Sequence, residues 1–119
     1  MDTIPIYDAT APIACTASRD EISLRVGVID HLRLNLRRIE RTDYGMRLFF
    51  PYRRDIVDDV RRFTVDEKRC CAFWGFETST HGDELVLRWD TPPALDDYVE
   101  KLIAYFEGDQ PITEVSELL

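Results

Sequence analysis

The fold is decided by one stretch, residues 54–89, which reads RDIVDDVRRFTVDEKRCCAFWGFETSTHGDELVLRW. In its first half, six residues recur at alternating steps of four and three and so share one stripe of a helix: Ile56, Val60, Phe63, Glu67, Cys70 and Trp74. That spacing predicts a helix from Arg54, with a carboxylate, Glu67, inside an otherwise apolar stripe. From Phe73 to Thr80 and from Glu84 to Trp89 the pattern alternates instead, around Thr80-His81-Gly82-Asp83. This change of period predicts a β-hairpin directly after the helix.

The same order of elements is predicted upstream. Ser18 and Glu21 have the spacing of a capping box, in which each side chain satisfies a free backbone N–H group at a helix start. A helix is therefore expected from about Arg19 to Leu32. Alternation over residues 34–41 and the β-prone run 46–50, separated by the turn residues 42–45, then predict a first hairpin.

Downstream, the sequence predicts a closing helix. Thr91 is expected to cap it, Pro92 suits its first position, and Asp96 and Asp97 suit the positive end of its dipole. Gly108 is placed to end it. Its buried face should be formed by Leu95, Val99, Leu102, Ile103 and Phe106.

These elements predict an α+β fold with the order helix-hairpin-helix-hairpin-helix, in which a four-stranded antiparallel sheet is covered on one face by helices. The 119 residues suit a single domain, 1–119. Residues 1–17 should be extended, and residues 109–119 form a tail that is either loose or docked on a neighbour. The residues expected to be buried share the inward stripes of their elements: Ile22, Val26, Ile29, Leu48, Phe50, Val60, Phe63, Phe76, Leu85, Leu87, Val99, Leu102 and Phe106.

Composition narrows the classes of partner and the compartment. The net charge of -8 and the pI near 4.7 disfavour nucleic acid and an anionic membrane surface, since either would repel the protein. No secretory signal and no apolar run of about 20 residues is present, so we expect a cytoplasmic protein. Three cysteines, two of them adjacent, make a poor disulfide framework, and free thiols are expected.

The cysteines carry the most unusual local pattern. Glu67 lies three and four residues before Cys70 and Cys71, which puts it within side-chain reach of both thiols on a helix. Cys15 lies just ahead of the first helix, where the dipole favours a thiolate. The simplest alternative is that these cysteines pack as small hydrophobic residues, as free cysteines commonly do.

Two short motifs give the sequence a resemblance. Ile13-Ala14-Cys15-Thr16 and Glu67-Lys68-Arg69-Cys70-Cys71-Ala72-Phe73, with Phe76, resemble a group of small uncharacterised bacterial proteins that carry I-A-C-T-L and E-x-x-C-C-P-F-x-x-F stretches. Some members occur beside regulators of the mercury-resistance type. The resemblance spans roughly residues 13–107 and implies that Cys15, Glu67, Cys70 and Cys71 are the shared positions. Here Ala17 stands in place of the group's leucine and Ala72 in place of its proline.

Three functions are compatible with these residues. The leading hypothesis is a thiolate site for a soft metal or metalloid ion, formed by Cys15, Cys70 and Cys71 with Glu67 as proton acceptor or outer partner. The second is a thiol redox protein, in which Cys15 attacks and Cys70 or Cys71 resolves. The third is a protein-interaction or structural domain with inert cysteines. The sequence has no motif for a nucleotide cofactor, and it leaves open enzymatic activity, a homo-oligomer and a protein partner.

Overall fold

A computed structural model describes residues 4–10, 19–70 and 73–107, without the side chains of residues 19–26, 70 and 98. The elements follow the chain in this order: α1 Arg19–Asn35, β1 Arg38–Arg41, β2 Gly45–Pro51, α2 Arg54–Cys70, β3 Gly75–His81, β4 Glu84–Asp90, the short 3-10 helix η1 Pro93–Leu95, and α3 Asp96–Phe106. The predicted α+β class, with three α-helices and one four-stranded antiparallel sheet, is confirmed within this part of the chain.

The sheet has the strand order β1-β2-β4-β3. Each hairpin contributes its second strand to the centre, so that β2 pairs with β4 over seven residue pairs from Gly45↔Asp90 to Pro51↔Glu84. The turn between β3 and β4 contains Gly82, whose φ of 61° explains the need for glycine at the first turn position.

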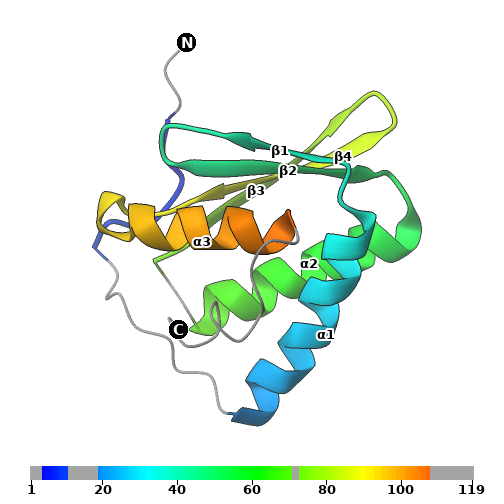
Figure 1. Cartoon of the computed structure of the whole chain (residues 1–119), viewed down its shortest axis with the longest axis horizontal. Helices are drawn as coiled ribbons and strands as arrows, with labels where there is room; N and C mark the ends of the chain where they lie inside the picture. The colour runs from blue at the N-terminus through cyan, green and yellow to red at the C-terminus, as the bar shows by residue number, and fades with distance from the viewer. Residues whose placement is uncertain (1–3, 11–18, 71–72, 108–119) are drawn as a thin grey trace.

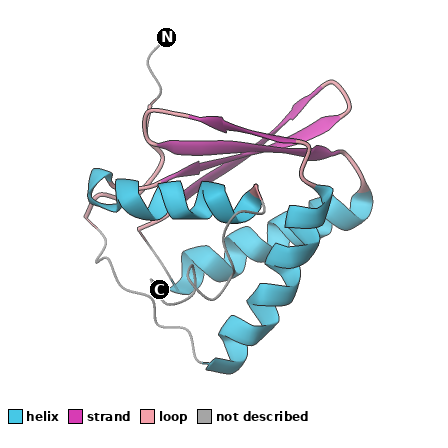
Figure 2. Cartoon of the chain, in the orientation of Figure 1, coloured by secondary structure: helices cyan, strands magenta, loops and turns pink. Residues whose placement is uncertain are grey.

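Alternation divides the sheet into two faces. Met46, Leu48 and Phe50 of β2 lie opposite Trp89, Leu87 and Leu85 of β4, and all six are buried. Figures 1 and 2 show the three helices on one side of the sheet. The other face carries the intervening pairs, among them Arg47↔Arg88 and Phe49↔Val86. We call it the outer face.

α2 supplies the helical side of the core. Ile56, Val60 and Phe63 on its stripe are buried. The Phe63 ring lies 5.9 Å from Phe76 and 5.4 Å from Trp89, both in edge-on arrangements that favour aromatic pairs. These contacts join α2 to strands β3 and β4.

Most of the expected core residues are buried. Leu48, Phe50, Val60, Phe63, Leu85, Leu87, Val99, Leu102 and Phe106 are confirmed, whereas Ile29 and Phe76 are only partly buried and pack against the core. The side chains of Ile22 and Val26 lie outside the described residues. Several large buried side chains were missed by the prediction: Leu32, Met46, Ile56, Phe73, Trp74, Trp89 and Tyr105.

Two expected boundaries are wrong. The strand predicted over residues 34–41 begins only at Arg38, because α1 continues to Asn35, whose side chain donates to the His31 carbonyl. Thr91 caps no helix: its hydroxyl lies 3.4 Å from the Tyr44 and Pro92 carbonyl oxygens, and η1 precedes α3. Asp96 and Asp97 do occupy the first turn of α3, as expected. Ser18, Gly108 and residues 109–119 lie outside the described residues.

The N-terminal stretch was expected to be extended, and residues 4–10 form neither helix nor strand. A turn follows at its end, where the Asp8 carboxylate accepts from the Thr10 backbone N–H and hydroxyl. In the described ranges no helix is long and apolar enough to cross a membrane.

Candidate functional site

The second half of α2 carries the one described side chain of the predicted thiol site. Glu67 is only 3% exposed, although it is a carboxylate, because it continues the stripe of Val60 and Phe63 into the core. A buried carboxylate is costly unless it has a polar partner, and Glu67 takes part in such an interaction. The prediction that a charged group lies inside this apolar stripe is confirmed.

A side-chain hydrogen bond links the last turn of α2 to the residue before β3. Lys68 Nζ donates a hydrogen bond of 2.5 Å to the Trp74 carbonyl, which ties the last turn of the helix to the residue before the strand. Phe73 and Trp74 are buried with their ring centroids 4.5 Å apart, and Trp74 meets Trp89 edge-on at 5.1 Å. This aromatic packing anchors the residues just before β3 against the core.

A recess of about 430 Å³ lies between the second half of α2 and the start of β3. It is lined by Ile6, Thr64, Val65, Lys68, Gly75 and Phe76. The N-terminal segment, the second half of α2 and the start of β3 therefore meet here, although Ile6 and Phe76 are far apart in sequence.

The N-terminal segment is held in place by a buried ion pair. The Ile6 backbone N–H donates to Asp90 Oδ2 at 3.0 Å, and the same oxygen accepts from Arg88 Nη2 at 2.8 Å. Asp90 is fully buried. At Gly75 an added Cβ would lie 2.3 Å from backbone atoms of Ile6 and Tyr7, so only glycine admits the segment. Sequence reasoning missed Asp90, although Arg88 two residues away on the same strand face was a local signal for it.

The predicted ligand set is described only in part. Cys70 is the last residue of α2, and its side chain, like the whole of Cys15 and Cys71, lies outside the described residues. Across the residues that the structure does describe, no three His, Cys, Asp or Glu side chains are grouped as metal ligands. The expected approach of Cys15 to Cys70 or Cys71 therefore stays a prediction.

A second polar cluster joins α1 to α2. His31 Nδ1 contacts the Asp59 carboxylate, and His31 Nε2 lies 3.8 Å from Asp55 Oδ2. The hydrogen bonds from Arg53 lower the pKa of Asp55, which keeps that carboxylate charged. His31 is partly exposed, and sequence reasoning missed its role as a link between the two helices.

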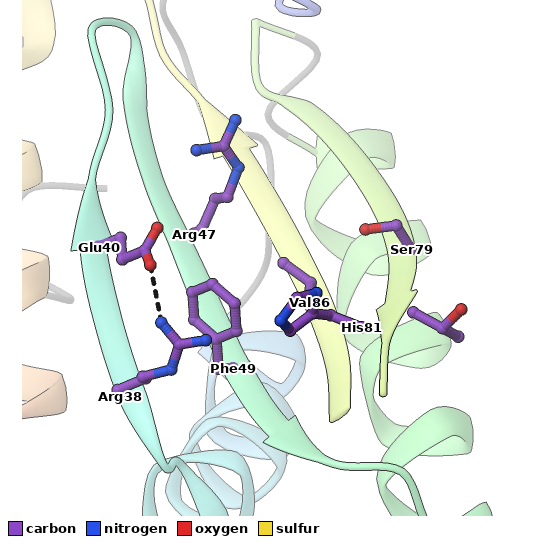
Figure 3. Close-up of a pocket in the computed structure, with 8 residues that line it drawn as sticks. Arg38, Glu40, Arg47, Phe49, Ser79, His81 and Val86 are labelled. Carbon is purple, nitrogen blue, oxygen red and sulfur yellow. Dashed lines mark hydrogen bonds and ion pairs between the residues drawn. The ribbon is translucent and has the colours of Figure 1, made fainter. Parts of the chain in front are cut away.

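The outer face of the sheet contains a shallow recess of about 320 Å³. The Arg38 guanidinium lies 3.6 Å over the Phe49 ring and donates to Glu40 at 2.7 Å (Figure 3). Figure 3 also shows Arg47 pointing along β2, away from His81. Because the charged groups pair or diverge here, this recess has no set of side chains directed at one point.

Comparison of the chain with protein-family models, with curated proteins and with solved structures finds no match.

Proposed function

We propose that the end of α2, together with Cys15, binds a soft or borderline metal or metalloid ion through cysteine thiolates. The observation that carries the proposal is the burial of Glu67, one helical turn before the Cys70-Cys71 pair. Positions three and four residues apart lie on the same helix face. If the helical path continues through Cys71, this carboxylate, which is withdrawn from water, lies within reach of both thiols.

The chemistry of ion binding explains a carboxylate at this place. A thiol that binds a metal ion loses its proton, so the uptake of an ion by two or three cysteines must release two or three protons. Glu67 accepts such a proton, or it stays charged and balances the ion from outside the ligand shell. Outer partners of this kind commonly change metal affinity about 10–100-fold.

The arrangement of the neighbouring segments favours the approach of Cys15. Residues 4–10 reach the recess beside the second half of α2, and α1 begins four residues after Cys15. Four residues span at most about 14 Å. Figure 1 shows the start of α1 and the end of α2 on the same side of the sheet. The wider architecture that we propose for this protein is a helix-hairpin unit used twice, with α3 closing the helical layer over one face.

The test is the native mass of the fully reduced protein with zinc, copper(I) or mercury(II) added in turn. We expect one ion per chain for at least one of these metals, with a matching loss of titratable thiols. Cys15→Ser should abolish the stoichiometric binding, and Glu67→Gln should weaken it roughly 10–100-fold. Glu107→Gln, at an exposed position just after α3, is the control for loss of one carboxylate.

Uptake of none of the three ions by the reduced protein would overturn the metal proposal. The redox hypothesis would then be tested by peroxide-driven disulfide formation between Cys15 and Cys70 or Cys71. If Cys15→Ser changed neither ion uptake nor disulfide formation, the cysteines would be packing residues.

A further inference from the structure

Strand β3 forms an edge of the sheet that lacks the usual protection. No strand in the described part of the chain pairs with its outer side. Natural edge strands are commonly short, bulged, or marked by lysine or proline. β3 is seven residues long, keeps an unbroken register with β4, and reads GFETSTH, without lysine or proline. Residues 77–81 are all exposed.

The opposite edge shows the contrast. β1 has only four residues, two of them arginines, and Arg38 and Arg41 both form ion pairs with side chains of the same molecule. Of the two edge strands, β3 is therefore the one that is long and that lacks residues which hinder pairing with another strand.

The hydrogen-bonding direction along β3 follows from its turn. A two-residue turn is closed by a hydrogen-bonded pair, here His81 and Glu84. Hydrogen-bonded and non-hydrogen-bonded pairs alternate in an antiparallel ladder, so Ser79 and Glu77 also bond to β4. The N–H and C=O groups of Thr78 and Thr80 consequently point outward, toward the free edge.

We propose that β3 pairs antiparallel with β3 of a second copy of this chain around a two-fold axis at Ser79. Two four-stranded sheets would then form one continuous sheet. The alternation of outward hydrogen bonds requires each residue to meet a partner of the same kind, so the axis must pass through a residue opposite its own copy. Pairing of Thr78 with the partner's Thr80 satisfies this requirement.

Charge selects Ser79 among the alternatives. With the axis at Ser79, Glu77 lies opposite His81 of the partner subunit. By symmetry, His81 lies opposite Glu77 of the partner subunit. With the axis at Glu77, two carboxylates would lie directly opposite each other, which is unfavourable. With the axis at Thr78, Glu77 would face a serine and gain no charged partner.

A second observation at the same edge also favours a covering partner. The recess beside the start of β3 includes Val65, which is 60% exposed, and the ring of Phe76. Val65 is an exposed apolar side chain and Phe76 is a partly buried one, and both lie beside the start of this edge strand. In the proposed register Gly82 of the partner subunit lies opposite Phe76, so the partner's β3–β4 turn would shield part of this apolar surface from water.

The register is tested by Ser79→Cys under mild oxidation, with the linked peptides identified by mass. Residues facing each other in a non-hydrogen-bonded pair have Cα atoms about 4.5 Å apart, within disulfide range. We expect a covalent dimer joined at position 79. The matched control is Thr80→Cys, whose two copies would lie about 7–8 Å apart and should not join. Linkage at position 80 but not 79 would overturn the proposal.

The dimer itself is tested by sedimentation of the reduced protein across a range of concentrations. Thr78→Pro removes an N–H group that points outward, so the β3–β4 ladder and the fold should persist. We expect the dimer dissociation constant to rise roughly tenfold or more, while Thr78→Val leaves it near the wild-type value. A wild-type protein that stays monomeric throughout, or a Thr78→Pro variant that is folded and equally dimeric, would contradict the pairing.

Discussion

Tyr105 in α3 shows how one buried hydroxyl links distant elements and responds to pH. Its Oη donates a hydrogen bond of 2.5 Å to Asp30 Oδ1 in α1, and the ring is fully buried. Burial and, after it, the bond to Asp30 raise the pKa of Tyr105 well above the usual value. The folded protein therefore holds this proton more tightly than the unfolded chain does.

The predicted result is a pH-dependent loss of stability at the alkaline end. The contribution of Tyr105 is complete below about pH 10, the pKa of an unfolded tyrosine, and falls as the pH rises above it. In a spectrophotometric titration of the five tyrosines, one phenol should ionise only as the protein unfolds. Tyr105→Phe should remove that late phase, and Tyr52→Phe, at an exposed ring, should keep it. A late phase that survives in Tyr105→Phe would refute this assignment.

Two buried carboxylates differ in how far the sequence reveals them. Glu67 could be predicted because its helical stripe is otherwise apolar, which is a local pattern. Asp90 is the last residue of a strand, where the alternation of polar and apolar residues does not indicate which side chains are buried. One of its hydrogen-bond partners is the Ile6 N–H, 84 residues away in sequence. Contacts between remote segments leave no local periodicity, so the docking of residues 4–10 could not be predicted.

At the scale of elements, the apolar stripes of the helices predict where truncation is costly. Leu102 of α3 and Phe63 of α2 are buried in the common core. Leu102→Ala and Phe63→Ala should each lower the free energy of unfolding by about 2–5 kcal/mol, measured by urea denaturation. Leu34→Ala in α1 is the matched control, since Leu34 is 81% exposed, and should change stability by less than about 0.5 kcal/mol. If both core variants lost less than that amount of unfolding free energy, the assignment of Leu102 and Phe63 to the core would be wrong.

The boundary between α1 and β1 shows why short patterns mislead. Leu34 and Leu36 alternate with polar residues, and this predicted a strand. Leu32 and Leu36 are also four residues apart, however, and Leu32 is buried while Leu36 packs against the core. A run this short fits both periods, and tertiary contacts favoured continuation of the helix to Asn35. By contrast, the long stripe of α2 predicted a helix that begins at Arg54, and α2 does begin there and ends at Cys70.

At the scale of the whole molecule, strand composition explains the order of the sheet. β2 and β4 carry mostly apolar residues and occupy the centre, whereas β1 and β3 are polar and form the edges. The sequence predicted two hairpins but not which strands would join them. The burial patterns indicate the reason, since the two most apolar strands gain most by pairing with each other.

The proposed thiol site also belongs to this scale, because it would require segments that are far apart in the sequence. Cys15 precedes the first helix and Cys70 ends the second, so a shared ion would join the N-terminal region to the end of α2. Zinc–sulfur bonds are about 2.3 Å long, so the sulfur atoms that share an ion must lie within a few ångströms of one another.

The most direct test of this account is the alkylation rate of each cysteine in the reduced protein, resolved by peptide mass with and without one equivalent of the bound ion. The account predicts that Cys15 and at least one of Cys70 and Cys71 become protected together, at the same ion concentration. Alkylation of Cys15 at an unchanged rate while the ion is bound would contradict it.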